Sequence, residues 1–219
     1  MSAPTPPTTT RRDGEGTRQK LLRAALELFT SEGFLASTTP VIAQRAGVAE
    51  GTIYRHFSSK EHLLNEVYRG TQRWATGVVK EVDGERALRA PERLGRIAKR
   101  FVETADRDPA GARMLFRRRD ETYLDPPSRD AAREFRESVQ QVVAAGKADG
   151  MVRAGPAELW TSIWLAVVAF IIERVAARDW TLDQPQVAQA IDAAWGAIAA
   201  PPLPVQGSMS SAEGPAAAG

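Results

Sequence analysis

The stretch from Thr38 to Lys60, T-T-P-V-I-A-Q-R-A-G-V-A-E-G-T-I-Y-R-H-F-S-S-K, predicts two short helices joined by a tight turn. Thr39 can cap the first helix, with Pro40 at its first position, where a missing N–H and a fixed φ cost nothing. Gly47 then follows where a left-handed backbone is needed. Two helices joined in this way can place the second one in a DNA major groove.

The second helix, expected to begin near Ala49, has only two strongly apolar residues. Ile53 and Phe57 stand four residues apart, so they anchor the helix along one narrow line and leave its polar side outward. Ser58, with Glu61 three residues later, predicts a capping box that opens the next helix.

Around this stretch the chain resembles the tetracycline-repressor (TetR) family of one-component bacterial transcriptional regulators. The resemblance starts at Thr17, ends at Val67 and covers about a quarter of the chain closely. It rests on the ordered residues Ala24, Ala25, Leu28, Phe29, Gly33, Phe34, Ile42, Ala43, Ala46, Gly47, Val48, Gly51, Thr52, Tyr54, His56, Phe57 and Lys60. It implies a homodimer that binds a palindromic operator in double-stranded DNA and is controlled by a small-molecule inducer.

Four residues are candidates for contacts with DNA bases. Arg55 can bond guanine O6 and N7 together, although it could instead contact only phosphate. Thr52 can offer its methyl or hydroxyl group, and Gly51 allows the backbone to approach DNA closely. Glu50, which departs from the family pattern together with Ala49, could accept from a cytosine amine or repel phosphate.

Four further residues are candidates for contacts with backbone phosphates. Thr39 could hold a phosphate through its hydroxyl and the helix start, and Lys60 could clamp one at the next helix start. Tyr54 and His56 match positions that bind phosphate in the family, while Tyr54 could also pack partly under Phe57.

Composition narrows the class of protein. The 219 residues carry a net charge of only +2, so the case for DNA rests on geometry rather than on bulk charge. The absence of cysteine excludes disulfides and cysteine-ligated metal sites. The N-terminus lacks the apolar segment of a signal peptide, so we expect a cytoplasmic protein. We also expect no cofactor and no metal.

Changes in composition suggest four regions. Residues 1–13, rich in Pro and Thr and ending in Arg11 and Arg12, predict a disordered arm that is either a solvated tail or a basic arm on DNA. Residues 14–62 form the expected helix-turn-helix domain, whose first helix runs from about Gly16 to Ser31. Residues 63–200 form the expected ligand-binding and dimerisation domain, and 201–219 a disordered tail.

Helical periodicity continues through the second domain. A long helix is expected after Ser59 up to Asp83, and the pattern predicts further helices that begin near Pro91, Asp108, Asp125, Leu159 and Pro185. The segment from Leu159 to Ile172 is the most apolar, but a membrane span needs roughly 20 such residues. The prediction is an all-α fold of about nine helices.

The last two helices offer more apolar surface than a monomeric bundle needs. This surplus predicts a homodimer through a four-helix interface, with candidate contacts at Ile163, Phe170, Ile191, Trp195 and Ile198. Aromatic and Met residues could line a pocket for a small apolar or amphiphilic inducer, or could simply pack in the core. These candidates are Trp74, Phe101, Met114, Phe116, Phe135, Trp160 and Trp164.

Two other classes remain open at this stage. An all-α enzyme would need a positioned base or nucleophile, yet the only histidines, His56 and His62, lack the spacing of a zinc helix. A helical adaptor that has lost DNA binding is the other alternative. A DNA-binding transcriptional regulator, most simply a repressor, is the preferred prediction.

Overall fold

The computed structural model describes residues 9–85, 87–117 and 121–201, except for the side chains of residues 9–13 and 121. Within these ranges the chain forms nine α-helices and a single 3₁₀ turn, η1. They are α1 (Thr9–Ser31), α2 (Thr39–Ala46), α3 (Glu50–His56), α4 (Lys60–Asp83), α5 (Ala90–Arg107), α6 (Pro109–Leu115), η1 (Glu121–Tyr123), α7 (Pro126–Ala148), α8 (Ala157–Ala176) and α9 (Pro185–Gly196).

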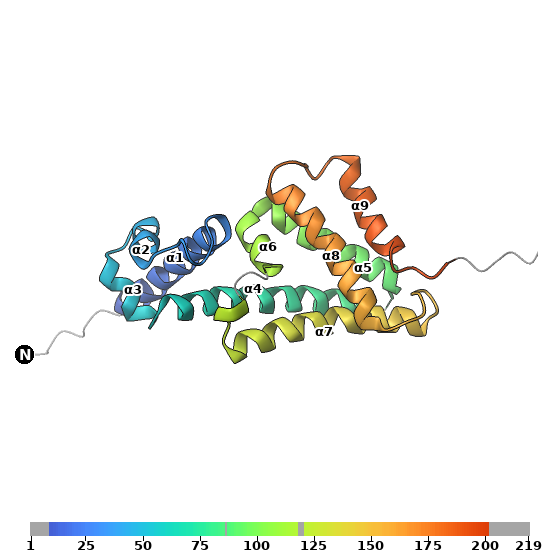
Figure 1. Cartoon of the computed structure of the whole chain (residues 1–219), viewed down its shortest axis with the longest axis horizontal. Helices are drawn as coiled ribbons and strands as arrows, with labels where there is room; N and C mark the ends of the chain where they lie inside the picture. The colour runs from blue at the N-terminus through green and yellow to red at the C-terminus, as the bar shows by residue number, and fades with distance from the viewer. Residues whose placement is uncertain (1–8, 86, 118–120, 202–219) are drawn as a thin grey trace, which may run out of the picture.

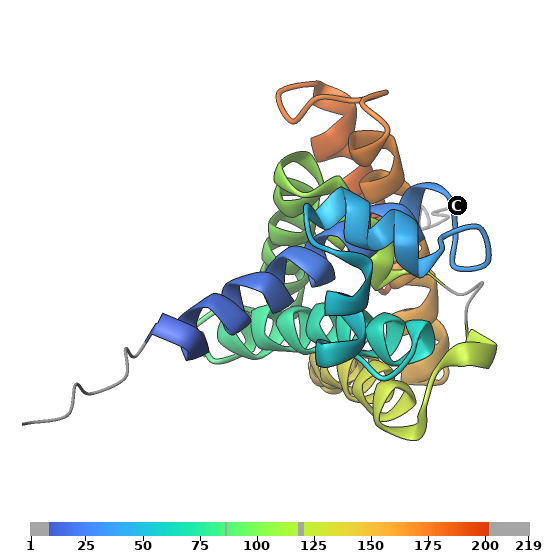
Figure 2. The same ribbon diagram turned by 90° about the vertical axis from the view of Figure 1, so that its left-hand side faces the viewer.

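The helices form an elongated molecule with two parts. Helices α1, α2 and α3 make an N-terminal unit at one end, and α5 to α9 make a C-terminal body at the other (Figure 1). Helix α4 runs along the molecule from one part to the other (Figure 1). Seen from the N-terminal end, α2 and α3 lie at the front of the molecule (Figure 2).

The predicted helix starts hold to within a residue except at α1 and at α8, which begins at Ala157 rather than near Leu159. Gly47 adopts φ 69° and ends α2 as predicted. The caps of α2 and α4 are Thr38 and Ser59 rather than Thr39 and Ser58, because Ile42 N bonds Thr38 O at 3.0 Å and Leu63 N bonds Ser59 O at 3.1 Å. These bonds close each first turn one residue away from the predicted cap.

Helix α1 begins seven residues earlier than about Gly16, at Thr9. Residues 9–13, predicted to be part of a disordered arm, are therefore helical. Intrinsic propensity does not explain this extension, because Gly14 and Gly16 inside α1 disfavour a helix. The rest of the predicted arm, residues 1–8, and the predicted tail from residue 202 lie outside the described residues.

Two hydrophobic cores meet along α4. Its first turns bury Leu63, Leu64, Val67 and Tyr68 against α1, α2 and α3. Further along, Ala75, Val78, Val79 and Val82 pack in the core of the body. Three residues of the body, Met114, Leu124 and Ala132, also pack in the first core. The body therefore contacts the core of the N-terminal unit directly, and a movement of these three residues would change the packing of that core.

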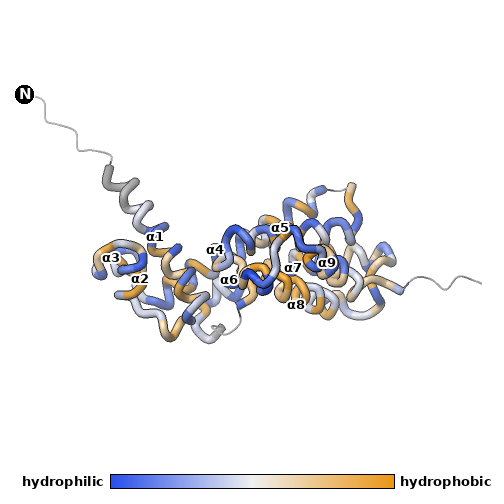
Figure 3. The backbone as a smooth tube through the Cα atoms, turned by 90° about the horizontal axis from the view of Figure 1, so that it is seen from above, coloured by the Kyte–Doolittle hydropathy of each residue, from blue (hydrophilic) through white to orange (hydrophobic). Residues whose placement is uncertain are grey.

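Helix α8 is the most continuously hydrophobic segment (Figure 3). Its length and composition alone would allow it to cross a membrane. It instead buries one face, with Trp164, Val168, Ile171 and Val175, in the core of the body. Apolar residues on its other face remain exposed, which explains its high hydropathy.

Candidate nucleic-acid interface and ligand cavity

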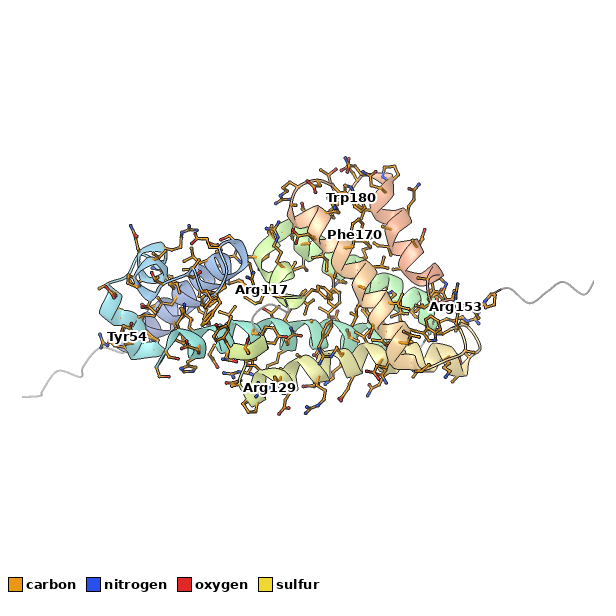
Figure 4. The ribbon with its side chains drawn as sticks, viewed as in Figure 1. Tyr54, Arg117, Arg129, Arg153, Phe170 and Trp180 are labelled. Atoms are coloured by element: carbon orange, nitrogen blue, oxygen red, sulfur yellow. The ribbon has the colours of Figure 1, made fainter. Side chains whose placement is uncertain are left out.

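Helix α3 presents a polar face to solvent. Ile53 and Phe57 are 1% and 2% exposed and fix the helix to the N-terminal core, as their spacing predicts. On the opposite side Glu50, Gly51, Tyr54 and Arg55 are exposed, and Tyr54 lies at the outer end of the molecule (Figure 4). A short helix anchored along one line with a free polar face has the form that enters a major groove.

The other candidate residues, in α3 and on α2, differ in how accessible they are. The hydroxyl groups of Thr39 and Tyr54 lie 3.0 Å apart, so the structure brings these two candidates together on one surface between α2 and α3. Thr52 and His56 are half-buried, and the His56 ring stands 6.4 Å from the Phe57 ring. Tyr54 is 55% exposed and is not packed under Phe57.

Lys60 is half-buried, and its ammonium group lies against the loop between α1 and α2. Its Nζ donates to the carbonyl oxygens of Phe34 and Ser37, both at 2.9 Å. The same ammonium lies 4.2 Å from the centre of the Phe34 ring. This side chain ties the start of α4 to the loop between α1 and α2, because buried carbonyls need donors and aromatic faces attract cations. The geometry gives Lys60 a role in holding the loop, where the sequence predicted a phosphate clamp.

An ion-pair network joins the N-terminal unit to the body. Glu66 of α4 pairs with Arg18 of α1 and with Arg69. Arg69 continues to Asp125, at the start of α7, at 2.7 Å. The hydrogen bond from Arg69, helped by the charge of Arg18, holds the pKa of Glu66 below its ordinary value. The network therefore favours ionised carboxylates at neutral pH.

A cavity of about 290 Å³ lies among α4, α6, α7 and α8. Its walls are mostly apolar, with two arginines and a few neutral polar groups. The lining residues are Tyr68, Gln72, Leu115, Phe116, Arg117, Ala132, Phe135, Arg136, Ser162, Leu165, Ala166 and Ala169. Ligand pockets in proteins are commonly clefts of this kind, at or above about 300 Å³.

Only two of the seven predicted pocket residues, Phe116 and Phe135, line this cavity. Phe101 and Trp164, each 1% exposed, are packed in the core of the body. Met114 belongs to the N-terminal core. These three are inside the protein because aromatic and Met residues at helical spacing pack wherever helices meet.

The other two predicted pocket residues lie elsewhere on the surface. Trp160 packs at the edge of the body core, where its indole Nε1 donates to Ala154 O at 3.2 Å. Trp74 is 38% exposed and lines a separate groove of about 380 Å³ against Leu22 and Arg23 of α1. Periodicity alone does not separate these seven positions, since all of them follow a helical spacing of apolar residues.

Gln72 also lines the cavity, although no sequence pattern marks it as a pocket residue. It is 1% exposed, and its Nε2 donates to Leu115 O at 3.1 Å. Its Oε1 is buried and has no hydrogen-bond partner among the residues that the structure describes. A buried acceptor without a partner costs free energy, which a donor group on a bound molecule would recover.

The predicted dimer residues divide into exposed and buried positions. Phe170 is 48% exposed, and Ile163, Ile191 and Trp195 are partly exposed on α8 and α9. Ile198 is fully buried in the body core and offers no surface to a partner, because it follows the end of α9 where the chain turns inward. Leu159, 48% exposed, continues the stripe of Ile163, Ala166 and Phe170 along α8.

Comparison with known proteins identifies the family. The profile of the family described as bacterial regulatory proteins, tetR family, matches residues 21–67, from α1 into α4. The transcriptional repressor KstR2 of Rhodococcus jostii is 30% identical over 158 residues, which are 68% of this chain and 75% of that protein. This chain belongs to the TetR family. It is therefore a DNA-binding transcriptional regulator and not an enzyme.

Other similarities of this TetR-family protein extend over most of its length. The transcriptional activator FasR of Mycolicibacterium smegmatis is 30% identical over 196 residues, 85% of this chain and 84% of that protein. A TetR-family regulator from Marinobacter aquaeolei has the same fold, with a TM-score of 0.74 and 18% identity over 87% of this chain and 99% of its own.

Among the described residues, no group of three or more His, Asp or Glu could hold a metal ion.

Proposed function

We propose that this TetR-family regulator acts as a homodimer that binds a palindromic operator through α3 and leaves it when a small molecule enters the body. The observation that supports the DNA-binding step most directly is the free polar face of α3, with Arg55 and Tyr54 exposed on an otherwise packed three-helix unit. One short helix alone would bind weakly, so two copies are needed for tight, selective binding.

The contacts with DNA follow from what each side chain presents. Arg55, exposed on α3, bonds guanine O6 and N7, while Gly51 allows the start of α3 to lie close to DNA. Tyr54 and Thr39, whose hydroxyl groups are 3.0 Å apart, bind one backbone phosphate together. Lys60 acts indirectly, by fixing the loop before α2.

The dimer forms through the exposed face of α8 together with α9. Leu159, Ile163, Ala166 and Phe170 make an apolar stripe along α8, and Ile191 and Trp195 extend it onto α9. Two copies of this surface produce a four-helix interface of two-fold symmetry. Binding to adjacent half-sites requires the two α3 helices of this dimer to stand about 34–36 Å apart, one turn of DNA.

The cavity among α4, α6, α7 and α8 receives the inducer. Its apolar walls and the unpartnered Gln72 Oε1 support a ligand with an apolar body and a hydrogen-bond donor. A ligand that favours a mis-spaced dimer by about 2–3 kcal/mol weakens operator binding some thirty- to a hundredfold or more. Release of a repressor is our preferred outcome because KstR2 is a repressor, while the similarity to the activator FasR makes activation the second candidate.

The experiment is selection of bound sequences from a random duplex library by the purified full chain. We expect a palindromic winner whose binding weakens steeply between two salt concentrations. Arg55→Met should lose about 1–3 kcal/mol of affinity and relax the preference at one base pair in each half-site. Arg153→Met is the matched control, because Arg153 lies at the opposite end of the molecule from Tyr54 (Figure 4).

Enrichment of no sequence by a folded dimer, with and without added small molecules, would refute operator binding. An enriched site without two-fold symmetry would refute the dimeric arrangement alone.

A further inference from the structure

Among the described residues, the charged groups that line the cavity are all of one sign. They are Arg117 and Arg136, and no carboxylate stands among the described lining residues. Arg136 is exposed on α7 and forms no ion pair with any residue that the structure describes. A cavity with apolar walls and cationic groups at its edge is complementary to a molecule with an apolar body and an anionic group.

The size of the cavity limits that molecule. At roughly 30 Å³ for each water-sized group, about 290 Å³ holds about ten such groups. A straight chain of about eight carbons with one carboxylate fits this space.

Arg117 also contacts the N-terminal unit. Its Nη1 donates to Thr30 O, 3.3 Å away, in the last turn of α1. That last turn contains no basic residue of its own. Because the final carbonyls of a helix carry partial negative charge, they are stabilised by a nearby cation. Arg117 thus supplies, from the segment after α6, the cation that the end of α1 lacks (Figure 4).

A carboxylate in the cavity would compete for the same guanidinium. A carboxylate carries a full negative charge and can accept two parallel hydrogen bonds from one guanidinium, whereas the carbonyl of Thr30 carries only a partial charge and accepts one. The bond to Thr30 O, at 3.3 Å, is long for its type. An anionic ligand would therefore draw Arg117 toward the cavity and away from α1.

We propose that the cavity binds an amphiphile with a single anionic group, held by Arg136 and Arg117, and that its capture of Arg117 releases the end of α1. Ligand binding therefore acts on the N-terminal unit directly through Arg117, and no rearrangement of the other helices of the body is required. This inference rests on the proposed function in one respect, namely that the released unit is the one that binds DNA.

Three probes of equal chain length and different charge test the ligand class. Octanoate, 1-octanol and octylammonium would each be titrated calorimetrically into the full chain. We expect octanoate to bind at least about tenfold more tightly than 1-octanol, as charge-assisted hydrogen bonds allow, and octylammonium to bind most weakly. Arg136→Met should remove most of the preference for octanoate, because it keeps an apolar stem without the charge.

Arg117→Met tests the connection to α1. In the wild-type protein, octanoate should weaken operator binding at least about fivefold. The Arg117→Met protein should bind the operator more weakly from the start and should respond to octanoate less than about twofold, although it still binds octanoate through Arg136. Arg153→Met, which also removes a guanidinium hydrogen bonded to a backbone carbonyl, Ala199 O, should behave as wild type.

The outcomes separate the inference from the proposed function. Equal binding of octanoate and 1-octanol, or no binding of any probe, overturns the anionic ligand class. Full release of operator by octanoate in the Arg117→Met protein overturns the role of Arg117. Neither result affects operator binding by the ligand-free protein, which tests the proposed function independently.

Discussion

Two glycines four residues apart in the helix-turn-helix are expected to respond in opposite ways to the same substitution. Gly47 has φ 69°, and a Cβ added there meets no atom within 4 Å. The cost of Gly47→Ala is therefore conformational, about 1–2 kcal/mol for a left-handed residue, partly offset by lower entropy of the unfolded chain. We expect a net loss of about 1 kcal/mol in the free energy of unfolding.

Gly51 lies in the first turn of α3 without a positive φ, and an added Cβ also meets nothing within 4 Å. Gly51→Ala should stabilise the helix by about 0.5 kcal/mol, because alanine loses less backbone entropy on folding. If Gly51 lies against DNA as proposed, the added methyl group should weaken operator binding by about 1–3 kcal/mol, the size of one lost base contact.

Thermal unfolding of the full chain and operator binding would be measured on both proteins. Gly47→Ala should lower Tm by about 2–4 °C, while Gly51→Ala should leave Tm unchanged or slightly higher. A Gly47→Ala protein as stable as wild type would refute the left-handed turn. A Gly51→Ala protein with unchanged operator affinity would refute the placement of α3 against DNA.

Further predictions concern the dimer, the core, the loop and pH. Phe170→Glu should convert the dimer to monomer in light scattering, since it buries a charge in the apolar stripe, and a dimer that persists would refute that interface. Trp164→Ala should cost about 3–5 kcal/mol in urea unfolding, and a loss below about 1 kcal/mol would indicate that the ring lines open space. Lys60→Met should destabilise the protein by about 1–3 kcal/mol but leave the salt dependence of operator binding unchanged. A weaker salt dependence would instead indicate that Lys60 contacts a phosphate, as the sequence predicted. The lowered pKa of Glu66 means that the ionised carboxylate stabilises the folded protein above its unfolded pKa, and that this stability is lost as pH falls through the folded pKa. Glu66→Gln should therefore flatten the plot of unfolding free energy against pH below about pH 4.5. An unchanged plot would refute the role of the network.

Local patterns predicted the elements well because short-range interactions decide where helices begin and end. Gly47 is required by backbone sterics at the end of α2, and Asp108 caps α6 by accepting from Gly111 N at 3.1 Å. Ile53 and Phe57 are buried, as their four-residue spacing requires. The caps of α2 and α4 were misplaced by one residue because neighbouring Ser or Thr residues are equally suited to that role.

Local patterns could not predict which of the aromatic side chains line the cavity and which pack in the core. Trp160, Trp164 and Phe101 follow the same periodicity as Phe116 and Phe135, yet only the last two line the cavity. Periodicity assigns a residue to a face of its helix, but the neighbour of that face depends on how the helices cross.

From the sequence alone one obtains the family, the helices, the exposed polar side of α3 and the apolar surplus on α8, because each depends on residues close together in the chain. Tertiary structure alone decides that Lys60 holds carbonyls 26 and 23 residues away and that Arg117 contacts Thr30 across 87 residues. Such partners are brought together by the packing of helices distant in sequence, and no local pattern predicts which helices will pack together.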